Sequence, residues 1–259
     1  MKKLLAAAAI AAVAATATLG AAFAQEVVRI GTEGAYPPFN YTDADGTLKG
    51  FDVDIARALC EKMEVTCEFV TQDWDGIIPA LNANKYDAII ASMSITDERK
   101  KQVDFTEKYY NTPPAIIVPA DSDLVVENGD VSVLSGKTIG AQSSTTHANY
   151  AEQKIDGATV RLYPTPAEAQ ADLEAGRIDA IIDDVVVGDE YVKKSGGKAK
   201  LAGTLTPDPV INGVGAGIAI RKGETELRDK FNAAIKAIRE DGTYDKVQKN
   251  YFDFDVYGG

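Results

Sequence analysis

The sequence predicts an α/β protein of two Rossmann-like lobes that face a central cleft and are joined by a hinge that the chain crosses twice. Three observations predict this fold. Short apolar strands alternate with amphipathic helices, a ten-residue segment recurs once, and two proline-rich breaks divide the chain. Its 259 residues are enough to fill two such lobes with hydrophobic cores.

The alternation of strands and helices is clearest in the first hundred residues. We expect strands at 27–30, 65–70 and 88–90, and helices at 51–63 and 77–84. Apolar strands separated by helices are typical of a mostly parallel sheet covered on both faces. Further helices are expected to begin at Thr96 and at Thr165-Pro166, each with a capping threonine, and a last one spans 224–240.

The repeated segment lies at 81–90 and again at 173–182, an offset of 92 residues. Leucine, alanine, a basic residue and the run Asp-Ala-Ile-Ile recur in the same places. By itself, Asp-Ala-Ile-Ile is an ordinary entry to a buried strand, so coincidence is the alternative. The further matches at one offset favour two related lobes.

The two breaks, at 111–114 and 206–209, contain paired prolines that cannot continue a helix. We expect residues 25–110 and 215–259 to form the first lobe and 115–207 the second. The hinges are then 111–114 and 208–214. Two such connections allow the lobes to close over a ligand.

The first 24 residues have the pattern of a secretory signal peptide. Lys2 and Lys3 precede an apolar, alanine-rich run that ends Ala22-Phe23-Ala24. A membrane anchor is the alternative, but the run stops at a cleavage pattern. We therefore expect cleavage after Ala24 and export to the periplasm. The formal net charge of −12 argues against a nucleic-acid partner.

The chain has two cysteines, Cys60 and Cys67. Export to an oxidising compartment favours a disulfide between them, with two free thiols or a metal pair as alternatives. The loop that this bond closes is short, so its expected contribution to stability is about 2–3 kcal/mol.

A ligand site is expected beyond the carboxyl ends of the strands, because open α/β sheets bind ligands there. Reading the residues that follow each strand, together with a nearby arginine and the single tryptophan, gives a candidate set. It comprises Glu33, Tyr36, Trp74, Ala91, Ser92, Met93, Ser94, Arg99, Gln142, Thr145, Thr146 and Asp184.

The chemistry of this set matches a zwitterion that carries an extra cation. Arg99 can hold a carboxylate with two hydrogen bonds, and Asp184 can accept from an ammonium group. Glu33 adds a negative charge that a cationic side chain would pair, and the aromatic rings can lie against such a side chain. Each residue has a structural alternative: Arg99 on the surface, Trp74 in a core, the hydroxyl residues as helix caps, and 183–184 as a solvated turn.

The chain resembles the lysine/arginine/ornithine-binding and histidine-binding proteins, in the polar amino-acid branch of the periplasmic solute-binding proteins. The stretches that carry the resemblance are 31–39, 50–56, 86–90, 92–99, 241–244 and 251–258. The resemblance implies a type II periplasmic binding protein fold, a disulfide between Cys60 and Cys67, and no cofactor or metal. It also implies a monomer that delivers a basic amino acid to the membrane permease of an ABC importer.

The same resemblance implies a role for each site residue. Arg99, Ser94 and the backbone at Thr146 resemble the carboxylate clamp, and Asp184 and Ser92 resemble the partners of the α-amino group. The rings that enclose the side chain correspond to Tyr36 and Trp74, and its charge partner to Glu33.

Two other functions remain open from the sequence. Glu33 and Trp74 together also resemble opine-binding relatives, so octopine or nopaline is an alternative ligand. Some dehydratases share the scaffold, and Glu33 or Asp184 would then be a general acid. The chain has one histidine, His147, which excludes multi-histidine metal sites. We expect a binding protein and not an enzyme.

Overall fold

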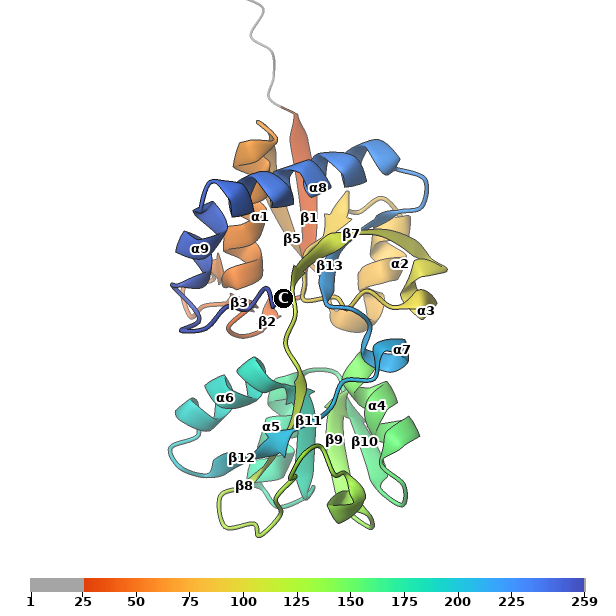
Figure 1. Ribbon diagram of the computed structural model, residues 1–259, viewed down its shortest axis with the longest axis vertical. Helices are drawn as coiled ribbons and strands as arrows, with labels where there is room; N and C mark the ends of the chain where they lie inside the picture. Colours follow the sequence, from red (N-terminus) through yellow and green to blue (C-terminus); the bar gives the residue numbers. More distant parts are fainter. Residues whose placement is uncertain (1–25, 259) are drawn as a thin grey trace, which may run out of the picture.

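The computed structural model describes residues 26–258, which form two lobes stacked along the long axis of the molecule (Figure 1). The predicted signal peptide and its cleavage after Ala24 lie outside the described residues. Within 26–258, every helix is too short or too polar to cross a membrane.

The first lobe is a five-stranded sheet with helices on both faces. The strand order is β5 (Thr66–Thr71), β1 (Val27–Thr32), β6 (Ala88–Ile89), β13 (Ala216–Arg221) and β7 (Val103–Tyr110). Helices α1 (Phe51–Lys62), α8 (Thr225–Glu240) and α9 (Thr243–Gln248) pack on one face, and η1 (Trp74–Gly76) and α2 (Ile77–Asn82) on the other. A small sheet of β2 (Ala35–Tyr36), β3 (Asn40–Thr42) and β4 (Leu48–Lys49) lies beside them.

The second lobe repeats this plan. Its strand order is β10 (Thr159–Tyr163), β9 (Thr138–Gln142), β11 (Ala180–Asp184), β8 (Pro114–Pro119) and β12 (Ala199–Thr204). Helices α4 (Thr146–Lys154) and α7 (Pro209–Asn212) contribute to the core on one face, and α5 (Pro166–Glu174) and α6 (Val185–Lys194) to the core on the other. The turn η2 (Ser132–Leu134) precedes β9, and α3 (Asp97–Lys100) belongs to the first lobe.

Both sheets are mixed in the same way. The first three strands in each order are parallel, the fourth is antiparallel to the third, and the fifth is antiparallel to the fourth. The predicted two-lobed α/β fold is therefore confirmed. β13 returns to the first sheet after the chain has completed the second, and the lobe boundaries given above remain a prediction.

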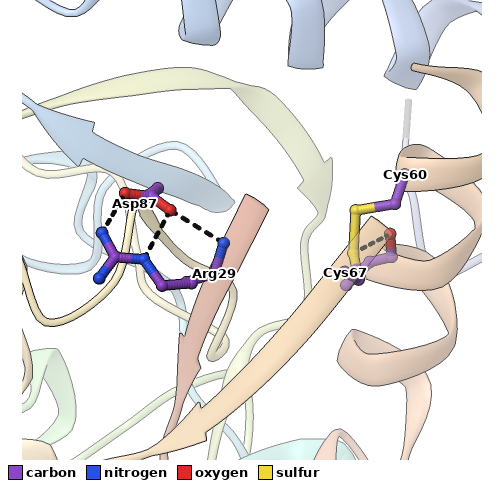
Figure 2. The surroundings of a disulfide bond; sticks show 5 residues. Arg29, Cys60, Cys67 and Asp87 are labelled. Carbon is purple, nitrogen blue, oxygen red and sulfur yellow. Dashed lines mark hydrogen bonds and ion pairs between the residues drawn. A yellow bond between two sulfur atoms is a disulfide. The ribbon is translucent and has the colours of Figure 1, made fainter. Parts of the chain in front are cut away.

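The repeat seen in the sequence has a structural meaning. In the first lobe, the Asp87 carboxylate accepts from the backbone N–H of Arg29 at 2.9 Å, and the N–H of Asp87 donates to the Arg29 carbonyl at 2.8 Å. Asp179 does the same with Thr138, at 2.7 and 2.8 Å. The aspartate of each Asp-Ala-Ile-Ile run thus fixes its strand to the start of the neighbouring strand (Figure 2 shows the pair in the first lobe).

The repeat also pairs a glycine with a large side chain in each lobe. A Cβ added to Gly31 would lie 2.4 Å from the ring of Tyr86, and one added to Gly140 would lie 2.6 Å from Ile178. Tyr86 and Ile178 are equivalent positions of the repeat. Each lobe therefore needs a glycine in its first central strand so that the repeated segment can pack closely against it.

The two cysteines form the predicted disulfide. Cys60 in α1 and Cys67 in β5 are bonded, with their Cα atoms 5.9 Å apart (Figure 2). The bond ties the helix to the edge strand of the first sheet, and it excludes the free thiols and the metal pair.

The predicted helix starts are correct in position, with one difference in detail. Thr96 and Thr145 each accept a hydrogen bond from a backbone N–H of the helix that they cap. Thr165 occupies the capping position of α5, but its side chain makes no capping hydrogen bond. Pro166 at the first helical position marks that start instead.

Candidate functional site

The carboxyl ends of the parallel strands of both sheets meet at a hollow between the lobes. It is lined by ten of the twelve predicted residues and by one further residue, His147. The predicted ones are Glu33, Tyr36, Trp74, Ala91, Ser92, Ser94, Arg99, Gln142, Thr145 and Thr146.

The other two predicted residues lie just outside this hollow. Met93 is fully buried and contributes to a groove on the outer side of Arg99. Asp184 lines a second hollow toward the hinge, which shares five lining residues with the first. The shared residues are Tyr36, Ser92, Ser94, Thr146 and His147. The two hollows are therefore neighbouring compartments of one cleft.

Arg99 reaches into the cleft from the short helix α3. Its Nη1 donates to the carbonyl of Ser94 at 3.0 Å, and its Nη2 donates to the carbonyl of Ser144 in the other lobe at 3.2 Å. Burial lowers the pKa of Arg99 to about 10, so the group stays charged at neutral pH. Within 26–258 no carboxylate forms an ion pair with it, which leaves its charge available to an anion.

Trp74 and Tyr36 form walls of the hollow, and both are held by contacts across the lobes. The Trp74 Nε1 donates to the carbonyl of Ser144 at 3.2 Å, and the Arg99 guanidinium lies 5.2 Å from the centre of the indole. The Tyr36 hydroxyl donates to Oδ1 of Asp183 at 2.7 Å. Trp74 therefore belongs partly to a hydrophobic core and partly to the wall of the hollow, and the Arg99 guanidinium lies against its ring.

Glu33 follows β1 and carries a charge that has only a neutral partner. Gln142 Nε2 donates to Glu33 Oε1 at 2.6 Å across the cleft. Burial, together with Asp73 and Asp75, raises the pKa of Glu33 to about 7, although the Gln142 hydrogen bond opposes the shift. A nearby cation would relieve this desolvation cost.

Asp183 and Asp184, at the end of β11, are both buried, which excludes the solvated turn. Oδ1 of Asp183 accepts from the Tyr36 hydroxyl and from the N–H of Asp184 at 2.8 Å. Asp184 accepts from the hydroxyl of Thr112 and caps α6 by accepting from the N–H of Val186 at 2.8 Å. Burial raises the pKa of Asp183 to about 7 and that of Asp184 to about 6.

A fourth buried carboxylate, Asp52, was missed by the sequence reasoning. It accepts from Asn40 Nδ2, Ser92 Oγ and the Tyr109 hydroxyl at 2.8–2.9 Å, and burial raises its pKa to about 6. Ser92 has a left-handed backbone with φ of +54°, so these bonds hold a strained loop at the cleft. The stretch 50–56, which is one of those that carry the family resemblance, contains Asp52 and could have pointed to it.

Carboxylates outnumber cationic groups at the cleft in the described chain. Glu33 lines the first hollow together with Arg99, and Asp184 lines the second. Asp183 and Asp52 are bonded to Tyr36 and Ser92 of the cleft wall, and all four carboxylates accept hydrogen bonds only from neutral donors. Such an arrangement favours a ligand that brings positive charge to the carboxylates and a negative group to Arg99.

The model of the bacterial extracellular solute-binding proteins, family 3, matches residues 28–254. The chain belongs to this family. Among curated family 3 relatives, the L-arginine-binding protein of Pseudomonas aeruginosa is 48% identical over 239 residues, covering 91% of each chain. The lysine/arginine/ornithine-binding periplasmic protein of Escherichia coli is 40% identical over 252 residues, covering 94% of each.

Solved structures of this family share the fold. An ancestral arginine-binding protein bound to arginine has a TM-score of 0.80 and 39% identity, over 88% of this chain and 99% of that one. An ancestral amino-acid-binding protein, a precursor of cyclohexadienyl dehydratase, has a TM-score of 0.78 and 34% identity, over 88% and 95%. The curated relatives are binding proteins, and the second structure shows that the scaffold also leads to an enzyme lineage.

Proposed function

We propose that this protein is the periplasmic solute-binding component of an ABC amino-acid importer, and that it binds a basic amino acid between its lobes. One observation carries the proposal: within residues 26–258, the cleft holds two carboxylates that accept only from neutral donors, Glu33 in the first hollow and Asp184 in the second, and a guanidinium, Arg99, that has no carboxylate partner. A free cationic amino acid brings two positive groups and one carboxylate, which is the complement of that arrangement.

The three charged groups of the ligand each have a proposed partner. Arg99 holds the carboxylate, with Ser94 and the N–H groups at the start of α4 around Thr146 as further donors. Ser92 and Asp184, which line the hinge-side hollow, take the α-amino group. The cationic side chain extends between the rings of Tyr36 and Trp74 toward Glu33, where its charge meets a carboxylate.

The curated relatives support the class of ligand, since their names give arginine, or lysine, arginine and ornithine. We infer that the chain acts as a monomeric binding protein, not as an enzyme, and that it delivers its ligand to the importer's permease. We also infer that residues 1–24 direct it to the periplasm and are removed after Ala24.

A thermal-shift and calorimetric panel tests the proposal. The purified mature protein is mixed in turn with arginine, lysine, ornithine, histidine, octopine, citrulline, glutamine and leucine. A ligand at 100 times its Kd stabilises the folded state by about 2.7 kcal/mol, so a basic amino acid raises Tm and leucine does not. A shift with glutamine and none with any cationic amino acid would disprove the ligand class.

A further inference from the structure

The wall between the two hollows contains the chain's one histidine, His147. It follows Thr146 at the start of α4, and its side chain is 17% exposed. Because it lines both hollows, a ligand in the cleft would lie next to this residue. Nothing in the roles assigned above uses this side chain.

One edge of the His147 ring faces Asp183. Its Nδ1 lies 3.6 Å from Asp183 Oδ1, slightly beyond hydrogen-bond distance. That same oxygen accepts from the Tyr36 hydroxyl and from the N–H of Asp184, so it acts as an acceptor. If Nδ1 carried no proton, its lone pair would face this oxygen and the two would repel each other. The stable arrangement therefore has the ring proton on Nδ1, directed at Asp183.

Burial and the positive charge of Arg99 keep the ring neutral, because they lower the pKa of His147 to about 4. Asp183 faces the ring from β11, and the charges of Asp184 and Glu33 help to raise the pKa of Asp183. A neutral imidazole has one N–H and one bare nitrogen. With the proton on Nδ1, the bare nitrogen is Nε2.

We propose that His147 is a specificity-determining residue, which offers an unprotonated Nε2 to donor groups of the ligand because Asp183 holds the ring proton on Nδ1. This inference rests on the proposed function. It adds one ligand-binding residue and a physical reason for selectivity between ligands. Asp183 is a positioning residue in this scheme, acting on the ligand through the imidazole.

The consequence is discrimination by hydrogen-bond polarity as well as by charge. A guanidinium or ammonium group donates to Nε2, and the carboxylate behind the ring strengthens the ring as an acceptor. A side-chain carboxylate or amide carbonyl finds no proton on Nε2. The opposite tautomer, with the proton on Nε2, would repel a cation and favour such acceptors.

Nuclear magnetic resonance gives a direct test, because one histidine means one set of imidazole signals. The ¹⁵N shifts of His147 are recorded in the mature protein with arginine at pH 8 and above, where Asp183 is ionised. The expected result is a neutral ring with the proton on Nδ1. A ring protonated on Nε2, or an imidazolium at pH 8, would overturn the proposal.

A variant of the positioning residue provides the second test. Asp183→Asn keeps Oδ1 as the acceptor for Tyr36, for Asp184 and for the Nδ1 proton, and it removes the negative charge that strengthens Nε2 as an acceptor. Calorimetry then compares arginine with citrulline, its neutral analogue. The expected loss is roughly tenfold for arginine and only about twofold for citrulline, since hydrogen bonds to charged groups are the stronger ones.

A matched control is available in the second lobe. Asp172 is a buried aspartate that accepts from the Tyr163 hydroxyl at 2.8 Å and lines neither hollow. Asp172→Asn removes a negative charge there, and we expect it to change both affinities by the same factor. If the wild type does not bind arginine, the proposed function fails. If it prefers arginine but Asp183→Asn leaves the ratio of the two affinities unchanged, only this inference fails.

Discussion

Replacing Glu33 by glutamine removes one negative charge from the cleft and changes little else. The substitution keeps the size of the side chain and an oxygen that can still accept from Gln142 Nε2, now at 2.6 Å. A hydrogen bond between charged partners contributes about 1.5–3 kcal/mol. Glu33→Gln should therefore weaken arginine binding by roughly 10- to 100-fold and leave citrulline binding nearly unchanged.

The pH dependence follows from the same residue. The pKa of Glu33 is raised to about 7, and only the ionised form attracts a cation. Affinity for arginine is then full above pH 7 and is lost as the pH falls through it, by roughly tenfold between pH 8 and pH 6. Titration calorimetry of both proteins with both ligands at these two pH values measures each quantity. Equal arginine affinity in wild type and variant at pH 8 would refute the reasoning.

Three further predictions concern other parts of the molecule. Arg99→Ala should reduce arginine affinity at least ~100-fold in calorimetry, because two charge-assisted hydrogen bonds to the ligand carboxylate are lost; retained affinity would exclude Arg99 from the site. Cys60→Ser should lower the free energy of unfolding in urea by about 2.5 kcal/mol, from the short loop that the disulfide closes, and an unchanged midpoint would contradict the entropic argument. Asp52 and Asp184 have pKa values raised to about 6 from 3.8, so their contribution to stability is present below pH 4 and is lost as the pH rises through 6. Without ligand, the midpoint of unfolding in urea should therefore be higher at pH 5 than at pH 8, and Asp52→Asn should reduce that difference.

Much of the fold was predictable because its signals are local. Apolar periodicity and capping residues mark the elements that were predicted within a few positions, and the repeat at 81–90 and 173–182 indicates that the two lobes share one architecture. The residues of the hollow were also predictable, because the carboxyl ends of the parallel strands meet at one edge of the sheet and ligands bind there. Asp184, predicted for the same cleft, lines the neighbouring hollow toward the hinge.

The residues that the sequence did not reveal depend on distant partners. Asp183 is explained by the hydroxyl of Tyr36, which is 147 positions away. Asp52 is explained by Ser92 and Tyr109, 40 and 57 positions away. No local pattern encodes such pairings, so these side chains looked like ordinary acidic residues. The ligand roles of the site residues stay a prediction until binding is measured.

The place of β13 in its sheet has a consequence for how the molecule is completed. This strand lies between β6 and β7, so it is central, yet it comes from near the end of the chain. All strands of the second lobe lie in one continuous stretch, from Pro114 to Thr204. During synthesis and export from the N-terminus, the second lobe can therefore assemble first, while the first lobe waits with a gap in its sheet. Loss of the last few dozen residues would leave that gap unfilled and remove a core strand, not a dispensable tail.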